Sequence, residues 1–179
     1  TGRPDAVDWD EPERVARSVR LMKVKHCVIT SVDRDDLRDG GSILWRETVR
    51  AVRRMSPGTT METLIPDFKG EWHNIDRIID AAPEIVSHNM ETVRRLTRQV
   101  RIQAQYDRSL AVLKYLKDQG LPRTKSGMML GLGETEEEVI QSLRDLREAK
   151  VDIITLGQYL QPTPKHLPVK EFVSPEQFE

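Results

Sequence analysis

The stretch from Thr124 to Glu134 carries the clearest chemical signal, because an apolar strand pattern leads into a turn with two glycines. Glycine lets a flat ligand approach the backbone, and open amides at the start of a helix can bind an anion. The turn lacks a following Gly-Lys-Ser/Thr and the full dinucleotide-binding glycine spacing, so it matches neither phosphate-binding motif. A tight strand-to-helix turn without a ligand is an equal alternative.

Two further places put polar groups where a site could form. Lys125 lies inside an apolar strand pattern, where a lysine could form a Schiff base, bind a carboxylate or pair with a structural acid. The segment His88–Thr92 places an amide and a carboxylate, Asn89 and Glu91, at the end of another strand. Such groups suit a ribose diol, but they could equally cap a helix.

The loop from Ser31 to Gly41 is rich in acids that could bind a divalent metal or an ammonium group. Its glycines come too late for an EF-hand, and a solvated loop with local salt bridges is the default interpretation. The four histidines show no metal-ligand spacing. Cys27 stands alone in a β-branched strand pattern, which favours a core position over a reactive one.

Composition narrows the function classes. The formal net charge of 179 residues is −1, so nothing indicates nucleic acid as a partner. No apolar run approaches the ~18 residues of a membrane-spanning helix. The length suits a single domain, residues 1–179, with an extended tail over 158–179. Because the chain opens with Thr1-Gly2-Arg3-Pro4, we expect it to be an internal piece of a longer protein.

Hydrophobic periodicity predicts the elements that must position these groups. Apolar, β-branched runs predict five strands, at 26–31, 60–65, 84–88, 123–130 and 151–156. Helices are expected between them, including one from Glu11 with Val15, Val19 and Met22 buried and a brief one from Glu91. Ser42 is the expected cap of the second helix, and Thr135 with Glu138 has capping-box spacing. The tail is expected to be irregular up to a helix capped by Ser174.

Strands that are apolar on both faces and alternate with helices indicate a parallel sheet, either doubly wound or closed as a barrel. Polar residues follow the ends of these strands, at Thr30-Ser31, His88-Asn89 and Gln158-Tyr159. In parallel α/β folds the carboxyl ends of the strands form the active-site face. The polar residues are therefore expected to gather where a site belongs.

Several strings together resemble the lipoyl synthase family of radical S-adenosylmethionine (SAM) enzymes, and the match runs nearly from end to end. No single string would suffice, but the presence of so many long strings in the same order argues against chance similarity. They are Thr1-Gly2-Arg3-Pro4, Val28 to Leu37 with Asp39-Gly40-Gly41, Glu62 to Phe68, His88 to Val93, Thr124 to Gly127, Gly131 to Glu134 and Leu156 to Pro162.

The resemblance implies a partial parallel (β/α)6 TIM-like barrel of the radical SAM type, here without its first strand. It implies SAM and two 4Fe-4S clusters as cofactors, and sulfur insertion at C6 and C8 of a protein-bound octanoyl chain through a 5′-deoxyadenosyl radical. The implied partners are an octanoylated lipoyl carrier protein or domain and a reductant such as flavodoxin or ferredoxin. The implied location is the bacterial cytoplasm, or a mitochondrial matrix or plastid in a eukaryote.

The resemblance also implies a set of SAM-binding positions in this sequence. Gly127, Met129, Gly131 and Glu134 match the glycine-rich adenine strand, and Asn89 and Glu91 match the polar pair near the ribose. Asp39, Gly40 and Gly41 are candidates for the methionyl amine; Lys125, Ser126 and Arg101 for its carboxylate; Gln158 and Tyr159 for the adenine edge. Strand alternation predicts that Thr30 and Glu62 line the cavity.

The chain departs from the family pattern in its cysteines. The cluster-binding cysteines and the C-terminal serine motif are absent, and solitary Cys27 cannot replace them because cluster ligation needs several thiolates. We therefore expect no metal ligand and no catalytic residue in these 179 residues, and an inactive chain when isolated. A Schiff-base lyase using Lys125 and a non-catalytic scaffold are the alternatives.

Overall fold

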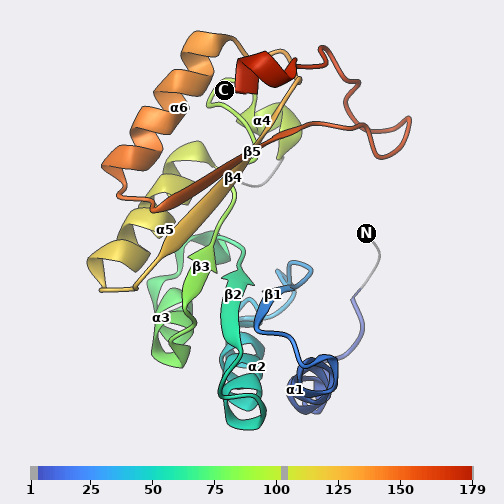
Figure 1. Cartoon of the computed structure of the whole chain (residues 1–179), viewed down its shortest axis with the longest axis vertical. Helices are drawn as coiled ribbons and strands as arrows, with labels where there is room; N and C mark the ends of the chain where they lie inside the picture. The colour runs from blue at the N-terminus through green and yellow to red at the C-terminus, as the bar shows by residue number, and fades with distance from the viewer. Residues whose placement is uncertain (1–3, 102–104, 179) are drawn as a thin grey trace. The chain divides into compact units, whose positions relative to one another are not determined.

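The computed structural model describes residues 4–101 and 105–178, in two compact units (Figure 1). The first unit contains the chain up to Ser87 together with Gln119–Pro122, and the second contains His88–Asp118 and the chain from Arg123 onward. No helix among these described residues is long and apolar enough to cross a membrane. The predictions at Thr1, Gly2 and Arg3 lie outside the described residues.

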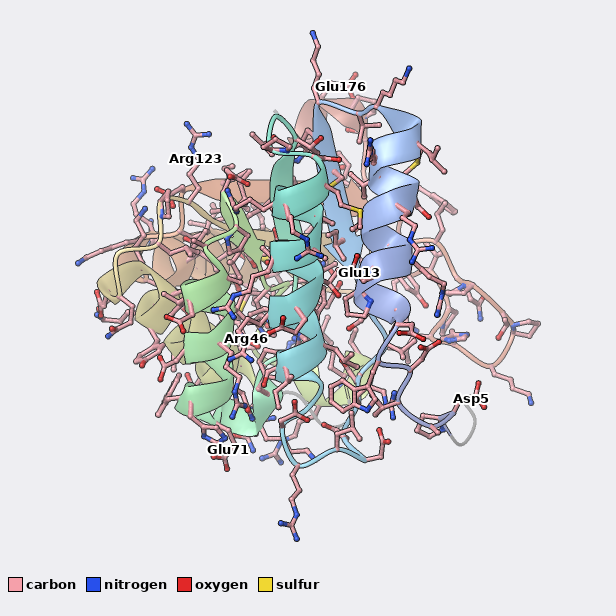
Figure 2. All side chains as sticks on the ribbon, turned by 90° about the horizontal axis from the view of Figure 1, so that it is seen from below. Asp5, Glu13, Arg46, Glu71, Arg123 and Glu176 are labelled. Atoms are coloured by element: carbon pink, nitrogen blue, oxygen red, sulfur yellow. The ribbon has the colours of Figure 1, made fainter. Side chains whose placement is uncertain are left out.

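In the first unit, three strands run parallel and alternate with helices. The strands are β1 (His26–Thr30), β2 (Thr60–Leu64) and β3 (Ile85–Ser87), and the helices are α1 (Glu11–Met22), α2 (Ser42–Met55) and α3 (Trp72–Ala81). The core forms where Met61 of β2 meets Val19 of α1 and Val52 of α2. Figure 2 shows the three helices side by side, marked by the labels Glu13, Arg46 and Glu71.

The second unit repeats the alternation. Strands β4 (Thr124–Leu130) and β5 (Ile153–Gln158) are parallel, and helices α4 (Thr97–Val100), α5 (Tyr106–Asp118) and α6 (Glu136–Glu148) accompany them. Its core joins Met128 of β4 to Leu113 of α5 and Leu146 of α6. Two 3-10 turns, η1 (Phe68–Gly70) and η2 (Pro175–Phe178), complete the described elements.

The five predicted strands are all present, but three local predictions are wrong. No helix begins at Glu91, because its φ of +66° is left-handed and its backbone bonds to β4 instead. Ser42 does not cap α2, because its hydroxyl donates to Asn74 Oδ1 inside the unit. Met22 is not part of the buried stripe of α1, since 61% of it is exposed and Ala16 takes the buried position.

Three other local predictions hold. Cys27 packs, half-buried, against the core of the first unit, and burial raises the pKa of its thiol. A raised thiol pKa leaves less of the reactive thiolate, in keeping with a structural cysteine. Thr135 and Glu138 form the predicted capping box of α6. The segment from Tyr159 to Ser174 contains no helix or strand, as expected.

Candidate functional site

Strands β4 and β5 divide their side chains between a covered and an open face. Ser126, Met128 and Leu130 are buried, and their register partners Ile154 and Leu156 lie on the same side. Because side chains alternate along a strand, the other residues point the opposite way. We call this second surface the open face; it consists of Lys125, Gly127 and Met129 on β4 and of the exposed Thr155 and Gly157 on β5. Gly127 is buried, and Met129 is partly buried and packs against the core cluster of the unit.

The segment from His88 to Glu91 lies beside β4 and brings Asn89 to the open face. Glu91 N donates to Gly127 O over 3.0 Å, and Met129 N donates to Glu91 O over 2.8 Å. A Cβ added at Gly127 would lie 2.9 Å from Asn89 Oδ1 and 3.1 Å from Thr155 Oγ1. Gly127 is thus a close-approach glycine, and three separate segments meet over it.

Hydrogen bonds with buried and partly buried polar groups anchor the segment from His88 to Glu91. Arg101 Nη1 donates to Asn89 O over 2.8 Å, and the fully buried His88 ring is 2.9 Å from Ser109 Oγ. Met90 N donates to Ser126 Oγ over 3.2 Å. Ser126 therefore lies on the covered face rather than the open one, and Arg101 reaches the backbone of Asn89.

In the glycine turn after β4, the backbone amides are bonded to a carboxylate of the same turn. The Glu134 carboxylate accepts from Gly131 N over 2.5 Å and from Leu132 N over 2.9 Å. Gly131 and Gly133 have φ values of +100° and +99°, a backbone region that favours glycine. The expectation that this turn offers open amides to an anion is wrong, because an internal carboxylate occupies them.

The start of α6 is tied to the same turn. Glu138 accepts from Thr135 N over 2.9 Å, and Thr135 Oγ1 accepts from Glu138 N over 3.3 Å. Arg95 donates to both Glu138 oxygens and, over 2.8 Å, to Gly133 O. The Arg95 guanidinium, followed by the Thr135 amide, holds the pKa of the Glu138 carboxyl below its ordinary value.

Gln158 and Tyr159 are engaged with the tail rather than with the open face. Gln158 Nε2 donates to Tyr159 O and Glu171 O, and Gln158 Oε1 accepts from Val173 N over 2.9 Å. Tyr159 is buried, and its hydroxyl donates to Leu167 O over 2.8 Å. The tail is thereby fixed across the end of β5.

In the first unit, Thr30 and Glu62 share the face opposite the core, as strand alternation predicts. Thr30 lines a hollow of about 380 Å³ whose wall also includes Gly40 and Gly41. Glu62 is buried and accepts from Ser87 Oγ over 2.6 Å, and it is not among the residues lining this hollow. The structure therefore gathers Thr30 and the two glycines but not Glu62.

Asp39, three residues before α2, caps this helix with its side chain. Its carboxylate accepts from Gly41 N over 3.3 Å and from Ile43 N over 3.0 Å. Gly40 and Gly41 have φ values of +58° and +82°, and a Cβ at Gly40 would lie 2.9 Å from Cδ1 of Phe68. The capping role that the sequence suggested for Ser42 thus belongs to Asp39.

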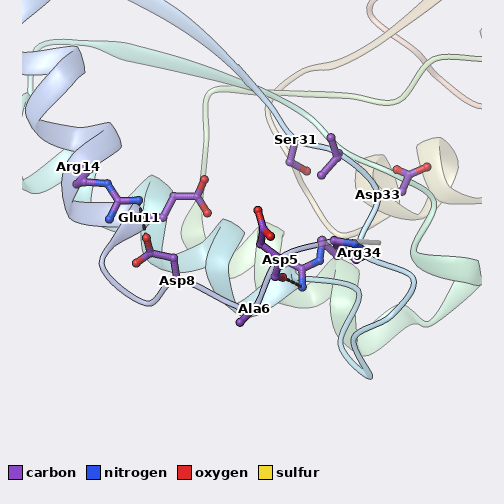
Figure 3. A pocket seen from close by; sticks show the side chains of 10 residues that line it. Asp5, Ala6, Asp8, Glu11, Arg14, Ser31, Asp33 and Arg34 are labelled. Carbon is purple, nitrogen blue, oxygen red and sulfur yellow. Dashed lines mark hydrogen bonds and ion pairs between the residues drawn. The ribbon is translucent and has the colours of Figure 1, made fainter. Parts of the chain in front are cut away.

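The acidic loop that follows β1 borders an open hollow of about 1020 Å³, seen from close by in Figure 3. Arg14 binds Asp8 at 2.6 Å, and Arg34 binds Asp36 at 2.8 Å and the carbonyl of Asp5 at 3.2 Å. Within residues 4–101 and 105–178, no three His, Cys, Asp or Glu side chains are placed to share a metal ion. The structure favours the solvated loop with local ion pairs.

Sequence reasoning missed Thr155 and Gly157. Both lie on the open face beside Gly127 and Met129, and both are exposed. The detectable signal was the alternation of Ile154 and Leu156 with Thr155 and Gly157, which places a hydroxyl and a glycine together on one face of β5.

The fold and the family are established by comparison with known proteins. The chain belongs to the radical SAM superfamily, whose family model matches residues 1–146. Its fold is shared with HydG, a maturase of the FeFe-hydrogenase, with a TM-score of 0.76 at 14% identity over 99% of this chain and 42% of that one. These matches confirm the predicted fold class, a partial parallel α/β barrel of the radical SAM type.

Much greater similarity is found to lipoyl synthases. The chain is 75% identical to lipoyl synthase of Flavobacterium johnsoniae over 99% of its own length and 62% of that protein. It is 74% identical to the mitochondrial lipoyl synthase of Nematostella vectensis over its whole length and 62% of that protein. The chain thus spans about three fifths of the curated relatives that it matches.

Proposed function

We propose that this chain forms the SAM-binding part of a lipoyl synthase, which inserts sulfur at C6 and C8 of an octanoyl chain on a carrier protein. The observation that carries the proposal is identity of 74–75% to lipoyl synthases across the chain. The meeting of Asn89 and Thr155 over Gly127 supports it, because such an arrangement suits a nucleoside with a diol.

The residues on and beside the open face fit SAM. Asn89 and Glu91 offer the ribose hydroxyls a donor and acceptors, while Gly127 and Met129 give a flat, uncharged surface. Lys125 supplies a cation for the carboxylate of the methionyl end. When bound, SAM supplies the means of activating an unreactive C–H bond. The residues of this chain bind and orient it, and none of them is assigned a catalytic role.

A 4Fe-4S cluster does not fit this chain. The sequence has one cysteine, and a cluster needs several thiolates. That cysteine, Cys27, is packed against the core with a raised thiol pKa. The two clusters would therefore be held by residues outside these 179. The octanoylated carrier and an electron donor such as flavodoxin or ferredoxin would complete the reaction.

The test uses the full-length protein after anaerobic reconstitution. It should contain two 4Fe-4S clusters, form 5′-deoxyadenosine from SAM and convert an octanoylated carrier domain to the lipoyl form. Asn89→Ala should bind SAM about 10-fold more weakly, the effect of losing one or two hydrogen bonds. Gln161→Ala, which removes another amide from the exposed tail, serves as the matched control.

Two results would reject the proposal. One is a full-length protein without an upstream cysteine cluster. The other is a reconstituted protein that neither binds SAM nor releases 5′-deoxyadenosine in the presence of a strong reductant.

A further inference from the structure

Three successive residues after β2 have left-handed backbone angles, and two of them are not glycine. Phe68, Lys69 and Gly70 have φ values of +45°, +55° and +79°. A positive φ is uncommon in residues other than glycine, and it is an outlier for a side chain as bulky as phenylalanine. Such backbone strain costs free energy and persists only where the surrounding structure imposes it. The contacts of the two side chains therefore indicate what this conformation provides.

Both side chains of this strained turn contact the loop that follows β1. The Phe68 ring is buried, and a Cβ added at Gly40 would lie 2.9 Å from its Cδ1 atom. Lys69 Nζ donates to Asp35 O over 3.3 Å and lies 3.3 Å from Asp35 Oδ1. The turn itself is closed by Asp67, whose carboxylate accepts from Lys69 N over 2.9 Å. The loop after β2 therefore supports the loop after β1 at two points, at the carboxyl ends of two neighbouring parallel strands.

Gly40 lies between the Phe68 ring and the hollow that Thr30 lines. That hollow, of about 380 Å³, is bordered by Gly40 but not by Phe68. A second hollow, of about 460 Å³, is bordered by both Gly40 and Phe68. A ligand in the first hollow would therefore meet Gly40, and Phe68 would act on that ligand only through the glycine.

The turn at Gly40-Gly41 suits a cation better than an anion. Gly40 N donates to Leu37 O over 3.1 Å. The Asp39 carboxylate accepts from Gly41 N over 3.3 Å and from Ile43 N over 3.0 Å. Because these amides are bonded within the turn, a ligand meets carbonyl oxygens and the negative charge of Asp39. Both favour an ammonium group, which has donors and no acceptor.

We propose that Phe68 is a positioning residue, which holds the turn at Gly40-Gly41 in the conformation that binds the methionyl amine of SAM. This inference rests on the proposed function. The ring does not touch the ligand, but it fixes the direction of the carbonyl groups beside Gly40. Glycine has no side chain to limit its backbone conformations, so without the ring the turn would be ordered only when SAM binds, at a cost in affinity.

The test measures ligand binding by the full-length, reconstituted protein with Phe68→Ala. Its affinity for SAM should fall about 10-fold, because binding must then order the turn. Its affinity for 5′-deoxyadenosine, which lacks the methionyl end, should stay unchanged. Phe68→Leu fills part of the space and should show a smaller loss in the same direction, and it replaces the alanine variant if that protein does not fold.

Ile78→Ala is the matched control, because it removes a fully buried apolar side chain from α3 in the same unit. It should lower the unfolding midpoint, as truncation of a core residue does, but bind SAM like the wild type.

A double-mutant cycle with Gly40→Ala tests the contact itself. The added Cβ presses on the Phe68 ring, so Gly40→Ala should weaken SAM binding in the otherwise wild-type protein. In Phe68→Ala the ring is gone, and the same change at Gly40 should then have a smaller effect.

Each remaining outcome overturns the proposal. Unchanged SAM affinity in both Phe68 variants shows that the ring does not position the turn for the ligand. Equal weakening of SAM and 5′-deoxyadenosine indicates general distortion, and an equal loss of SAM affinity in Ile78→Ala assigns the effect to stability alone. Additive effects in the cycle show that the ring does not act through Gly40. Failure of the proposed function looks different, because the wild-type protein itself would then not bind SAM.

Discussion

The two units each contain a glycine-containing turn between a strand and a helix, closed by a nearby carboxylate. In the first unit Asp39 caps the turn at Gly40-Gly41, and in the second Glu134 caps the turn at Gly131-Leu132. The turns differ in what covers them. The ring of Phe68 lies against Gly40, whereas the carbonyl of Glu171 lies against Gly131. A ring at the end of a side chain can shift, but a backbone carbonyl held by other bonds cannot do so cheaply.

The difference extends to the backbone angles. Gly40, at a φ of +58°, lies in the left-handed region that other residues sometimes adopt. Gly131, at +100°, lies beyond it. Its carbonyl also accepts from Lys170 N and Glu171 N, which fixes the tail over the turn. The second turn is therefore the more rigid and the less tolerant of a side chain.

The largest expected effect is that of Gly131→Ala. It should destabilise the second unit by about 3 kcal/mol, because the added Cβ meets a backbone carbonyl at a strained φ. Gly40→Ala should destabilise the first unit by only about 1 kcal/mol. Hydrogen exchange of amides in β4 and in β1 measures the two units separately. Equal losses in both variants would contradict the comparison.

Removal of the capping carboxylates should have an intermediate effect. Glu134→Ala leaves two amides of the turn without an acceptor and should cost about 2 kcal/mol. Asp39→Ala removes the cap of α2 and should cost about 1 kcal/mol. Chemical denaturation measures the loss of stability of each variant, and hydrogen exchange of amides in β4 and β1 shows which unit loses it. Glu134→Gln keeps one acceptor oxygen and should fall between the wild type and alanine; a loss as large as that of alanine would argue against the two-amide role.

The smallest effect concerns pH. Because Arg95 lowers the pKa of Glu138 in the folded state, the pair stabilises the second unit above pH 4.5, and this contribution is lost as the pH falls through the lowered pKa. Arg34 acts likewise on Asp36 in the first unit, with an ordinary value of 3.8. Carboxyl NMR titration should show the Glu138 pKa returning toward 4.5 in Arg95→Gln, with Asp36 unchanged. A pKa that stays low would assign the shift to the capping amide alone.

The sequence predicted what depends on local pattern. All five strands follow from their apolar, β-branched runs, and the capping box follows from the three-residue spacing of Thr135 and Glu138. Alternation along β1 and β2 correctly placed Thr30 and Glu62 on the face opposite the core. These features need only the neighbours in the chain, so a single sequence determines them.

The failures depend on contacts between distant residues. The helix expected at Glu91 gives way to backbone bonds with Gly127 and Met129, more than thirty residues later in the chain. The Ser42 hydroxyl bonds to the Asn74 side chain instead of capping its own helix. The Gln158 side chain bonds to the backbone of the tail at Glu171 and Val173. Thr155 gains its place in the site from Asn89 and Gly127 on other segments. Residue spacing in a single sequence does not predict contacts between residues so far apart in the chain.

The internal carboxylate of Glu134 has a consequence for the proposed binding of SAM, because other metabolites carry the same nucleoside. Adenine nucleotides share the nucleoside of SAM but continue into phosphates, which commonly bind to free amides at the start of a helix. Here Gly131 N and Leu132 N are already bonded to Glu134, and the negative charge beside them repels another anion. In nucleotide-binding proteins, a similar glycine turn binds the phosphates through its free amides. This turn has no free amides at Gly131 and Leu132 to bind them.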